Sequence, residues 1–312
     1  MRQPKETIML FLKGMAMGGA DVIPGVSGGT IAFITGIYEE LLNSIKSVDA
    51  EAIKLFFTFK WGAFWQKING KFLFPLLLGI LTSVFTLASL MHYLMEYHPI
   101  SLWSFFFGLI VVSSILVLRE TRQWNVLNII IILLGAVIAF IITEATPATT
   151  PNNLLFTFVA GAIAICAMIL PGISGAFILL ILGKYAYITG AVSELDFVTL
   201  GVFASGCLIG LLTFARGVSW LFNHYHDLTV GLLSGFMIGS LNKVWPWKIP
   251  TAFRINSEGE QVAKLTENVL PGEYLRQLGE DPEVFQAVLF LALGIFIVVA
   301  IEKIANYKIG PR

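Results

Sequence analysis

Charged side chains and cysteines are both scarce in this chain of 312 residues. Lys, Arg, Asp and Glu make up 13% of the residues, about half the share found in soluble proteins, while hydrophobic residues make up 56%. The two cysteines, Cys166 and Cys207, lie inside apolar runs, which favours small buried side chains over a disulfide. The composition excludes an ordinary soluble enzyme and predicts a polytopic membrane protein.

Several chemical signatures are also missing. The sequence has no basic patch suited to nucleic acid, no nucleotide P-loop, no serine elbow and no pair of catalytic carboxylates within an apolar run. His224, His226 and Asp227 form only a crude metal pattern that no cysteine or further histidine joins. We therefore expect no metal and no cofactor.

Apolar runs between polar breaks predict ten membrane elements in two sets of five. The first run of each half is short, and a Pro-Gly pair separates it from the next run. The predicted elements are 7–21, 26–45, 72–94, 100–118 and 126–143 in the first half, and 154–170, 173–190, 197–222, 228–241 and 285–304 in the second.

The two halves share a motif. "IPGVSGGTIAFITGIY" (23–38) aligns without a gap with "LPGISGAFILLILGKY" (170–185), including Pro-Gly-x-Ser-Gly, a later glycine and the closing tyrosine. The alignment predicts a duplicated unit, with a first membrane repeat over 1–145 and a second over 146–312. The first repeat carries an insertion at 49–70, and the second carries a polar insertion at 242–284.

The distribution of Lys and Arg predicts how the repeats are oriented. With a re-entrant hairpin and about three spans, each unit crosses the membrane an odd number of times, so the second repeat is inverted relative to the first. This arrangement places most basic residues and both termini on the cytoplasmic side, and the 242–284 loop outside. The segment 49–70 mixes Lys with aromatic residues and predicts an interfacial helix on the inner leaflet.

The Pro-Gly pairs predict re-entrant turns. The run 7–21 rises about 22 Å as a helix, which is short of the roughly 30 Å hydrocarbon core. Pro24 and Pro171 are expected to act as hinges that break each hairpin. The predicted fold is therefore an all-α polytopic membrane protein with two inverted repeats, each a re-entrant helical hairpin plus about three transmembrane helices.

Residues at these turns are candidates for binding an anion. Amide donors at a helix start attract an oxyanion, glycines allow it to approach closely, and hydroxyl groups add donors. The expected phosphate or carboxylate ligands are Gly25, Ser27, Gly28, Gly29 and Thr30, with Gly172, Ser174 and Gly175 in the second copy. The second copy offers fewer donors, because Ala176 and Phe177 replace Gly29 and Thr30. The alternative is that these small residues mediate close helix packing.

Three charged residues within or beside apolar runs have two interpretations each, since intramembrane charges are energetically unfavourable. Asp21 either caps a helix or takes and releases a proton or cation that drives transport. Arg216 either neutralises a phosphate or extends to the cytoplasmic interface, and Arg119 either binds the phosphate or anchors its span at the interface.

The stretch "GGADVIPGVSGGTIAFITGIYEELLNSI", with "LPGISGAFILLILGKY" and "NKVWPW" (242–247), resembles the bacterial polyprenyl-phosphate translocases called PopT. The resemblance covers essentially the entire chain. It implies that the protein flips undecaprenyl phosphate from the outer to the inner leaflet of the bacterial cytoplasmic membrane. This would recycle the lipid carrier used to make cell-envelope polymers such as peptidoglycan. By motif, it points to Asp21 and to the two turns as the functional positions.

Two other classes stay open. Membrane undecaprenyl-pyrophosphate phosphatases use a similar motif, but theirs reads Pro-Gly-x-Ser-Arg-Ser after a pair of glutamates, whereas Gly28 stands here at the arginine position. A small-anion symporter or channel could use the same helix ends without a lipid. We expect a transporter rather than an enzyme, with coupling to protons or sodium and assembly into a homo-oligomer left undetermined.

Overall fold

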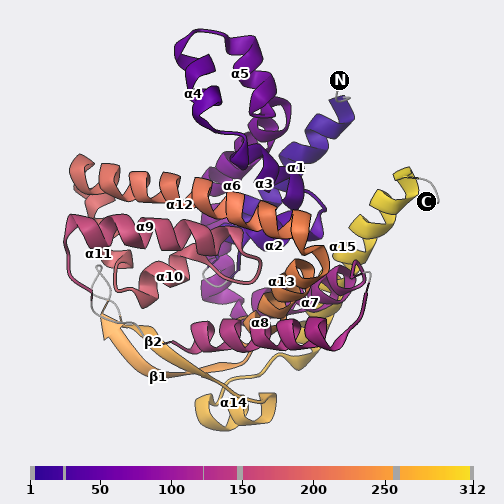
Figure 1. The fold of residues 1–312 in the computed structure, drawn as a ribbon. Coiled ribbons are helices and arrows are strands. Elements are labelled where there is room, and N and C mark those ends of the chain that lie inside the picture. Colours follow the sequence, from indigo (N-terminus) through magenta and orange to yellow (C-terminus); the bar gives the residue numbers. More distant parts are fainter. Residues whose placement is uncertain (1–3, 24–25, 122, 146–149, 256–260, 310–312) are drawn as a thin grey trace.

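The computed structural model describes residues 4–23, 26–121, 123–145, 150–255 and 261–309 (Figure 1). The first half consists of α1 (Pro4–Asp21), α2 (Gly28–Ile34), α3 (Tyr38–Lys46), α4 (Ala50–Phe57), α5 (Trp61–Lys67), α6 (Gly70–Tyr97), α7 (Pro99–Leu118) and α8 (Val126–Glu144). The second half consists of α9 (Leu154–Ile169), α10 (Gly175–Ile181), α11 (Tyr185–Ser193), α12 (Phe197–His224), α13 (His226–Ser240), β1 (Lys248–Ile255), β2 (Gln261–Asn268), α14 (Pro271–Leu278) and α15 (Val284–Ile309).

The helices are those of a polytopic membrane protein, as predicted. Within the described residues, α6, α7, α8 and α12 are each long and apolar enough to cross a membrane, and the bent pair α10–α11 could form one more span. The outer surface of α8 is apolar, because Leu133, Val137 and Ile141 are all more than half exposed. Apolar side chains exposed along a whole helix indicate contact with lipid.

Two runs predicted as single elements are broken in the structure. α2 ends before Gly36, which has a φ of 68°, and α10 ends before Gly183, which has a φ of 64°. A left-handed residue of this kind ends a helix, and glycine adopts that conformation without strain. α10 and α11 consequently meet at 108°. Each half therefore carries a short helix, α2 or α10, between two breaks.

The segment 49–70 forms two short helices rather than one. α4 and α5 are joined at Phe59, which has a φ of 56°, and they project from one end of the molecule (Figure 1). Lys67 of α5 holds them together through ion pairs with Asp49 at 3.0 Å and Glu51 at 2.5 Å. Phe57 and Trp61 are exposed, as expected for a helical pair that lies at a membrane surface.

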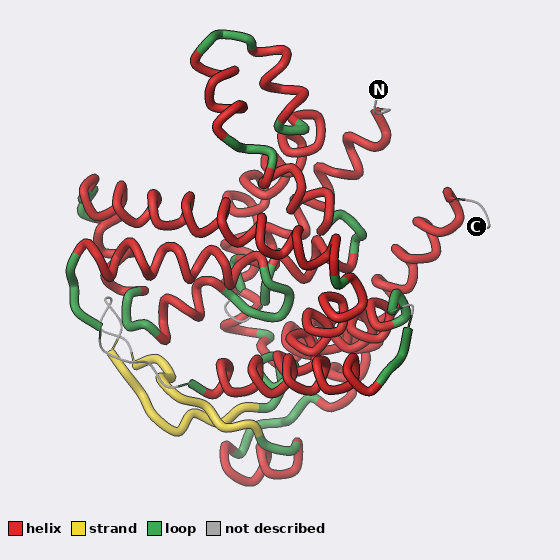
Figure 2. Tube along the Cα trace, in the orientation of Figure 1, coloured by secondary structure: helices red, strands yellow, loops and turns green. Residues whose placement is uncertain are grey.

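The polar stretch 242–284 contains a β-hairpin, which the sequence reading did not predict. Strands β1 and β2 pair antiparallel, and the short helix α14 follows them (Figure 2). Ile249, Val269 and Tyr274 pack against Ile100 of α7 and Ala287 of α15. The hairpin and α14 thus cover one end of the membrane helices, opposite the end from which α4 and α5 project (Figure 1).

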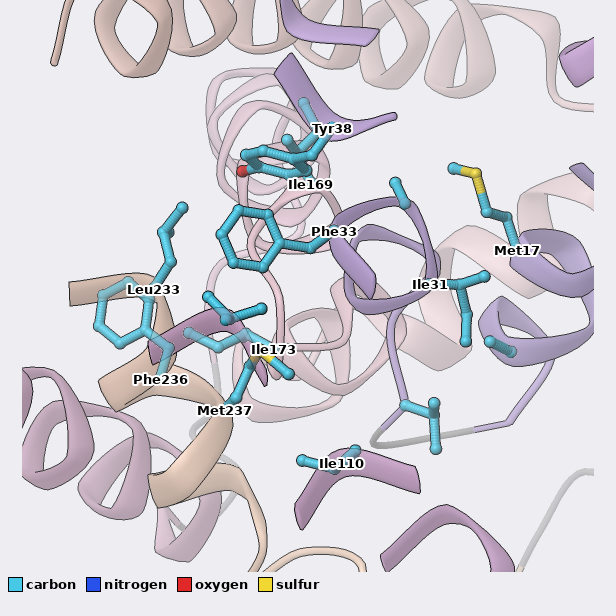
Figure 3. Close-up of a cluster of buried hydrophobic side chains, with 14 of the residues drawn as sticks. Met17, Ile31, Phe33, Tyr38, Ile110, Ile169, Ile173, Leu233, Phe236 and Met237 are labelled. Carbon is cyan, nitrogen blue, oxygen red and sulfur yellow. The ribbon is translucent and has the colours of Figure 1, made fainter. Parts of the chain in front are cut away.

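The core is formed jointly by the two halves. Phe33 and Tyr38 of the first half lie beside Ile169 and Ile173 of the second, with Phe236 of α13 on the same cluster (Figure 3). Burial here brings the segments 26–38 and 169–173 into the centre of the molecule, while the lipid-facing helices surround them.

Glycines allow four helix pairs to approach very closely. A Cβ built on Gly79 of α6 would lie 2.1 Å from the carbonyl oxygen of Phe11 on α1, and one on Gly206 of α12 would lie 2.1 Å from that of Phe158 on α9. Gly294 of α15 would meet Phe105 O on α7 at 2.3 Å, and Gly235 of α13 would meet Ile132 O on α8 at the same distance. Small residues of this kind drive helix association in membranes.

Gly206→Ala is expected to lower the thermal unfolding midpoint of the purified protein by several degrees, because the new methyl group forces α9 and α12 apart. Gly201→Ala on the same helix is the matched control, since a Cβ there meets nothing within 4 Å. Alanine also has the better helix propensity, so Gly201→Ala should keep or slightly raise the midpoint. Equal midpoints for the two variants would contradict this packing.

Candidate functional site

The two predicted turns are hydrogen-bonded to each other in the interior. Ser27 Oγ lies 2.8 Å from the carbonyl oxygen of Met168 and 3.1 Å from that of Leu170, so its hydroxyl hydrogen serves these two acceptors. In return, the backbone N–H of Gly172 donates to Thr30 Oγ1 at 2.9 Å. Ser27 and Thr30 are completely buried. Residues more than 140 positions apart are thus joined in one polar contact.

Glycine is required at two places in this contact. A Cβ on Gly29 would lie 2.1 Å from the carbonyl oxygen of Ile169, so any larger residue would push the first turn away from the second. Gly172 has a φ of 87°, and a Cβ there would lie 2.8 Å from Phe236 O of α13. Gly29 and Gly172 therefore serve close packing of the turns, which is one of the two interpretations of these glycines, and anion binding stays a prediction.

Asp21 is the last residue of α1, and its carboxylate lies at the start of α2. Its Oδ1 accepts a hydrogen bond from the N–H of Gly28 at 2.7 Å, while the N–H of Gly29 donates to Ser27 Oγ at 3.1 Å. The carboxylate therefore occupies the position that the sequence predicts for the oxyanion of a ligand, at the positive end of a short helix. Of the two roles considered for Asp21, helix capping is the contact seen here, and proton or cation exchange stays a prediction.

The second turn differs at the same point. Ser174 caps α10 by accepting from the N–H of Phe177 at 3.4 Å. Met168 stands where the aligned first copy has Asp21, so no carboxylate is present at that position. The structure shows no hydrogen bond from the Gly175 N–H among the described residues. The two copies thus differ in how the first amide of the short helix is capped.

The other predicted site residues lie apart from this contact or outside the described part of the chain. Arg216 donates from Nη2 to the carbonyl oxygen of Val48 at 3.1 Å, on the connection between α3 and α4. Arg119 is exposed at the C-terminal end of α7. Pro24 and Gly25 are not among the described residues, and Pro171 is buried at the second turn.

Two further features are cavities lined by other helices and the β-hairpin. One of about 460 Å³ is lined mainly by apolar side chains of α6, α7 and α15, including Leu94, Phe105 and Phe290. A second of about 100 Å³ is polar, and it lies where the ends of α8 and α13 meet α10 and the β-hairpin. Lys243 and Lys248 line the second cavity. The sequence reading missed both residues, although Lys243 belongs to the "NKVWPW" motif.

The described residues contain no group of three His, Cys, Asp or Glu side chains that could hold a metal ion. The ring of His224 stacks on Trp220 with centroids 4.7 Å apart, and His226 Nδ1 lies 3.3 Å from Asp227 Oδ1. These residues of the crude metal pattern therefore contact neighbouring side chains of the chain itself.

A helical membrane protein with broken helices and polar turns at its centre has the architecture found in many transporters. The chain belongs to the undecaprenyl phosphate translocase-like family, whose model matches residues 17–262. It is 45% identical over 296 residues to a polyprenyl-phosphate transporter of Vibrio cholerae serotype O1, covering 95% of this chain and 96% of the relative.

A polyprenyl-phosphate transporter of Staphylococcus aureus is 32% identical over 253 residues, covering 75% of this chain and 85% of the relative. Both relatives carry the name of a transporter rather than that of an enzyme. No solved structure matches the chain at a significant level.

Proposed function

We propose that the protein moves undecaprenyl phosphate across the bacterial cytoplasmic membrane and so returns the lipid carrier for cell-envelope synthesis. The observation that carries the proposal is the pair of hydrogen-bonded turns, with the Asp21 carboxylate at the start of α2. A charged phosphate cannot enter hydrocarbon without polar partners, whereas its isoprenoid tail can remain in lipid. Polar turns within a shell of lipid-facing helices could supply those partners.

The apolar cavity between α6, α7 and α15 favours a lipid over a soluble anion. Its volume of about 460 Å³ and its lining of side chains such as Leu94 and Phe105 suit part of a hydrocarbon chain. A carrier of small anions has no need of such an apolar cavity. The names of the two relatives support the same substrate class.

We further propose that the chain is two inverted repeats, 1–145 and 146–312, with both termini in the cytoplasm. Corresponding contacts support this: Gly79 meets Phe11 as Gly206 meets Phe158, and Phe11 and Phe158 occupy equivalent positions when the alignment of 23–38 with 170–185 is extended toward the N-terminus. α7 packs on α15, and α8 packs on α13, which exchanges the last helices between the halves. Alternating exposure of the turns to either leaflet would follow from rocking of the two repeats.

In this proposal, the phosphate binds at the turns by replacing their present partners. Protonation of Asp21 would weaken its hold on the Gly28 N–H and admit the phosphate, which couples transport to a proton, or to sodium if that cation neutralises the carboxylate. Pro24 and Pro171 would act as hinges. The proposed ligands are Gly25, Ser27, Gly28, Gly29, Thr30, Gly172, Ser174 and Gly175, with Arg119 and Arg216 receiving the phosphate at the cytoplasmic mouth.

One experiment separates the three functional classes. Proteoliposomes containing the protein are supplied with labelled undecaprenyl phosphate, undecaprenyl pyrophosphate or inorganic phosphate. We expect movement of undecaprenyl phosphate between leaflets, no release of phosphate from the pyrophosphate form and no uptake of inorganic phosphate. Phosphate release would favour an enzyme, and uptake of inorganic phosphate without lipid movement would favour a small-anion symporter; either result would overturn the proposal.

A further inference from the structure

We propose that Lys243 and Lys248 form a second phosphate site. A phosphate monoester binds there before or after it passes the two hydrogen-bonded turns. That the phosphate belongs to a lipid rests on the proposed function. That the cavity binds a phosphate rests on the residues of the cavity itself. The cavity lies between the end of α8, from the first repeat, and elements of the second repeat, at the end of the molecule covered by the β-hairpin. The positive-inside distribution predicts that this end is extracytoplasmic.

The cavity is small, and most of its lining is polar. Its polar lining comes from the end of α8, the turn after α13 and both strands of the hairpin, and it includes Thr143, Asn242, Lys243, Lys248, Thr266 and Asn268. Its volume of about 100 Å³ is well below the roughly 300 Å³ at which pockets for drug-sized molecules begin. It therefore suits one phosphate group rather than a sugar or a nucleotide.

Within the described part of the chain, the side chains of Lys243 and Lys248 contact aromatic rings but no directly paired carboxylate. Lys243 Nζ lies 4.2 Å from the centroid of the Phe177 ring, and Lys248 Nζ lies 4.5 Å from that of Trp103 and donates to the Lys243 carbonyl oxygen. Among the described residues, neither lysine forms an ion pair. Burying two lysine side chains in one small cavity without a directly paired anion is costly, and a phosphate between them would supply that pairing.

Burial lowers the pKa of both lysine side chains. It lowers the pKa of Lys243, and it lowers the pKa of Lys248 to about 7, with repulsion from Lys243 adding to the effect on Lys248. Among the described residues, Glu144 is the one carboxylate that lines the cavity, and it opposes both shifts. Its Oε1 already accepts from Asn242 Nδ2. An arriving phosphate would raise both pKa values again.

Hydrogen bonds between the β-hairpin and the turn after α13 fix the shape of the cavity. Asn268 Nδ2 donates to the backbone oxygen of Asn242 at 2.8 Å and to its side-chain oxygen at 2.7 Å. Trp245 Nε1 donates to Val269 O at 2.8 Å. These bonds fix the base of the hairpin over the turn that carries Lys243. A site assembled before binding loses little conformational entropy when the ligand arrives.

The cavity lies against α10, the short helix that follows the second turn. Phe177 and Leu180 form its wall, and Ser174 of the second turn accepts from the N–H of that same Phe177. Three residues of helix rise only about 4.5 Å, so the cavity and the second turn are separated by little more than the Phe177 ring. The aligned residue in the first copy is Thr30, which takes part in the contact between the turns. The lysine site is therefore adjacent to the proposed transport path.

The test measures binding to the purified full-length protein with two probes, farnesyl phosphate as a short prenyl monophosphate and inorganic phosphate. Lys243→Gln and Lys248→Gln should each weaken binding of farnesyl phosphate about tenfold, and the double variant should weaken it further. Lys60→Gln is the control, because Lys60 is an exposed lysine at the start of α5. Unchanged thermal midpoints establish that the variants fold. Equal affinities in the wild type and the folded double variant would overturn the proposal.

A second readout separates a binding role from a structural one. Because burial lowers the pKa of Lys248 to about 7, we expect most Lys248 side chains to be neutral at pH 8 before binding and charged beside the bound phosphate, so binding should take up protons from the buffer. Calorimetry in two buffers of different ionisation enthalpy measures this uptake. Lys248→Arg should still bind phosphate but show a smaller uptake, because arginine is charged throughout. The same uptake in wild type and Lys248→Arg would contradict a direct contact with Lys248.

The two probes also separate this proposal from the proposed function. Binding of inorganic phosphate that depends on the lysines, in a protein that moves no undecaprenyl phosphate, would support the site and refute lipid transport. Lipid transport that is unchanged by Lys243→Gln together with Lys248→Gln, with farnesyl phosphate bound as in the wild type, would refute the site and leave lipid transport standing.

Discussion

Asp21→Asn is expected to abolish the response of undecaprenyl phosphate transport to an imposed proton gradient, while leaving the protein folded. Asparagine keeps a side-chain oxygen that can accept the Gly28 N–H, which Asp21 Oδ1 now accepts at 2.7 Å. It cannot take up or release a proton. Initial transport rates in proteoliposomes, with and without a gradient, should therefore differ in the wild type and coincide in the variant.

Asp21→Ala separates the charge of this residue from its hydrogen bond. Alanine removes both, so the Gly28 N–H loses its acceptor at a cost of about 1–3 kcal/mol, and the thermal midpoint should fall below that of Asp21→Asn. A sodium gradient tests the second candidate ion in the same vesicles. If Asp21→Asn responds to both gradients as the wild type does, Asp21 has no role in coupling and serves only as a cap of α2.

Ser27→Ala is expected to slow transport by about tenfold or more, because it removes the side chain that joins the two turns. The Met168 and Leu170 carbonyl oxygens would lose their shared donor, and the Gly29 N–H would lose its acceptor. Leaving such buried groups unsatisfied costs about 1–3 kcal/mol. Since 1.4 kcal/mol corresponds to a factor of ten, the equilibrium between the states of the turns should shift by roughly that factor or more.

Thr30→Val is a second test of the contact between the turns, and Ser205→Ala is the control. Thr30→Val keeps the shape of the side chain but removes the acceptor of the Gly172 N–H, so it should slow transport in the same manner as Ser27→Ala. Ser205 is an exposed serine on α12 whose hydroxyl bonds only to its own helix, at Val202 O. Its replacement by alanine should change nothing. Transport at the wild-type rate in both Ser27→Ala and Thr30→Val would show that the contact between the turns is not part of the mechanism.

The sequence predicted the main features of the fold from two signals. Scarce charge and long apolar runs indicated a polytopic helical membrane protein, and the repeated Pro-Gly-x-Ser-Gly motif identified the two segments that meet at the centre. Both signals are local, because burial in lipid constrains composition and a broken helix needs particular residues. The breaks at Gly36 and Gly183 were not predicted, since a glycine within an apolar run is also compatible with an unbroken transmembrane helix.

Other features depend on contacts that no local pattern contains. The hydrogen bond from Gly28 to Asp21 requires the chain to turn back over seven residues, so the sequence alone left capping and coupling as equal options. The β-hairpin was missed because β1 contains a proline and its pairing register is irregular there. Lys243 and Lys248 become notable only once α8, α10 and the hairpin enclose them.

The most direct test is the rate at which labelled undecaprenyl phosphate changes leaflet in proteoliposomes. The label is placed in one leaflet, and its appearance in the other is followed for empty liposomes, for the wild type and for Ser27→Ala reconstituted at equal density. We predict exchange at least tenfold faster with the wild type than in empty liposomes, and a rate near that of empty liposomes with Ser27→Ala. Exchange with the wild type that equals that of empty liposomes would contradict the account.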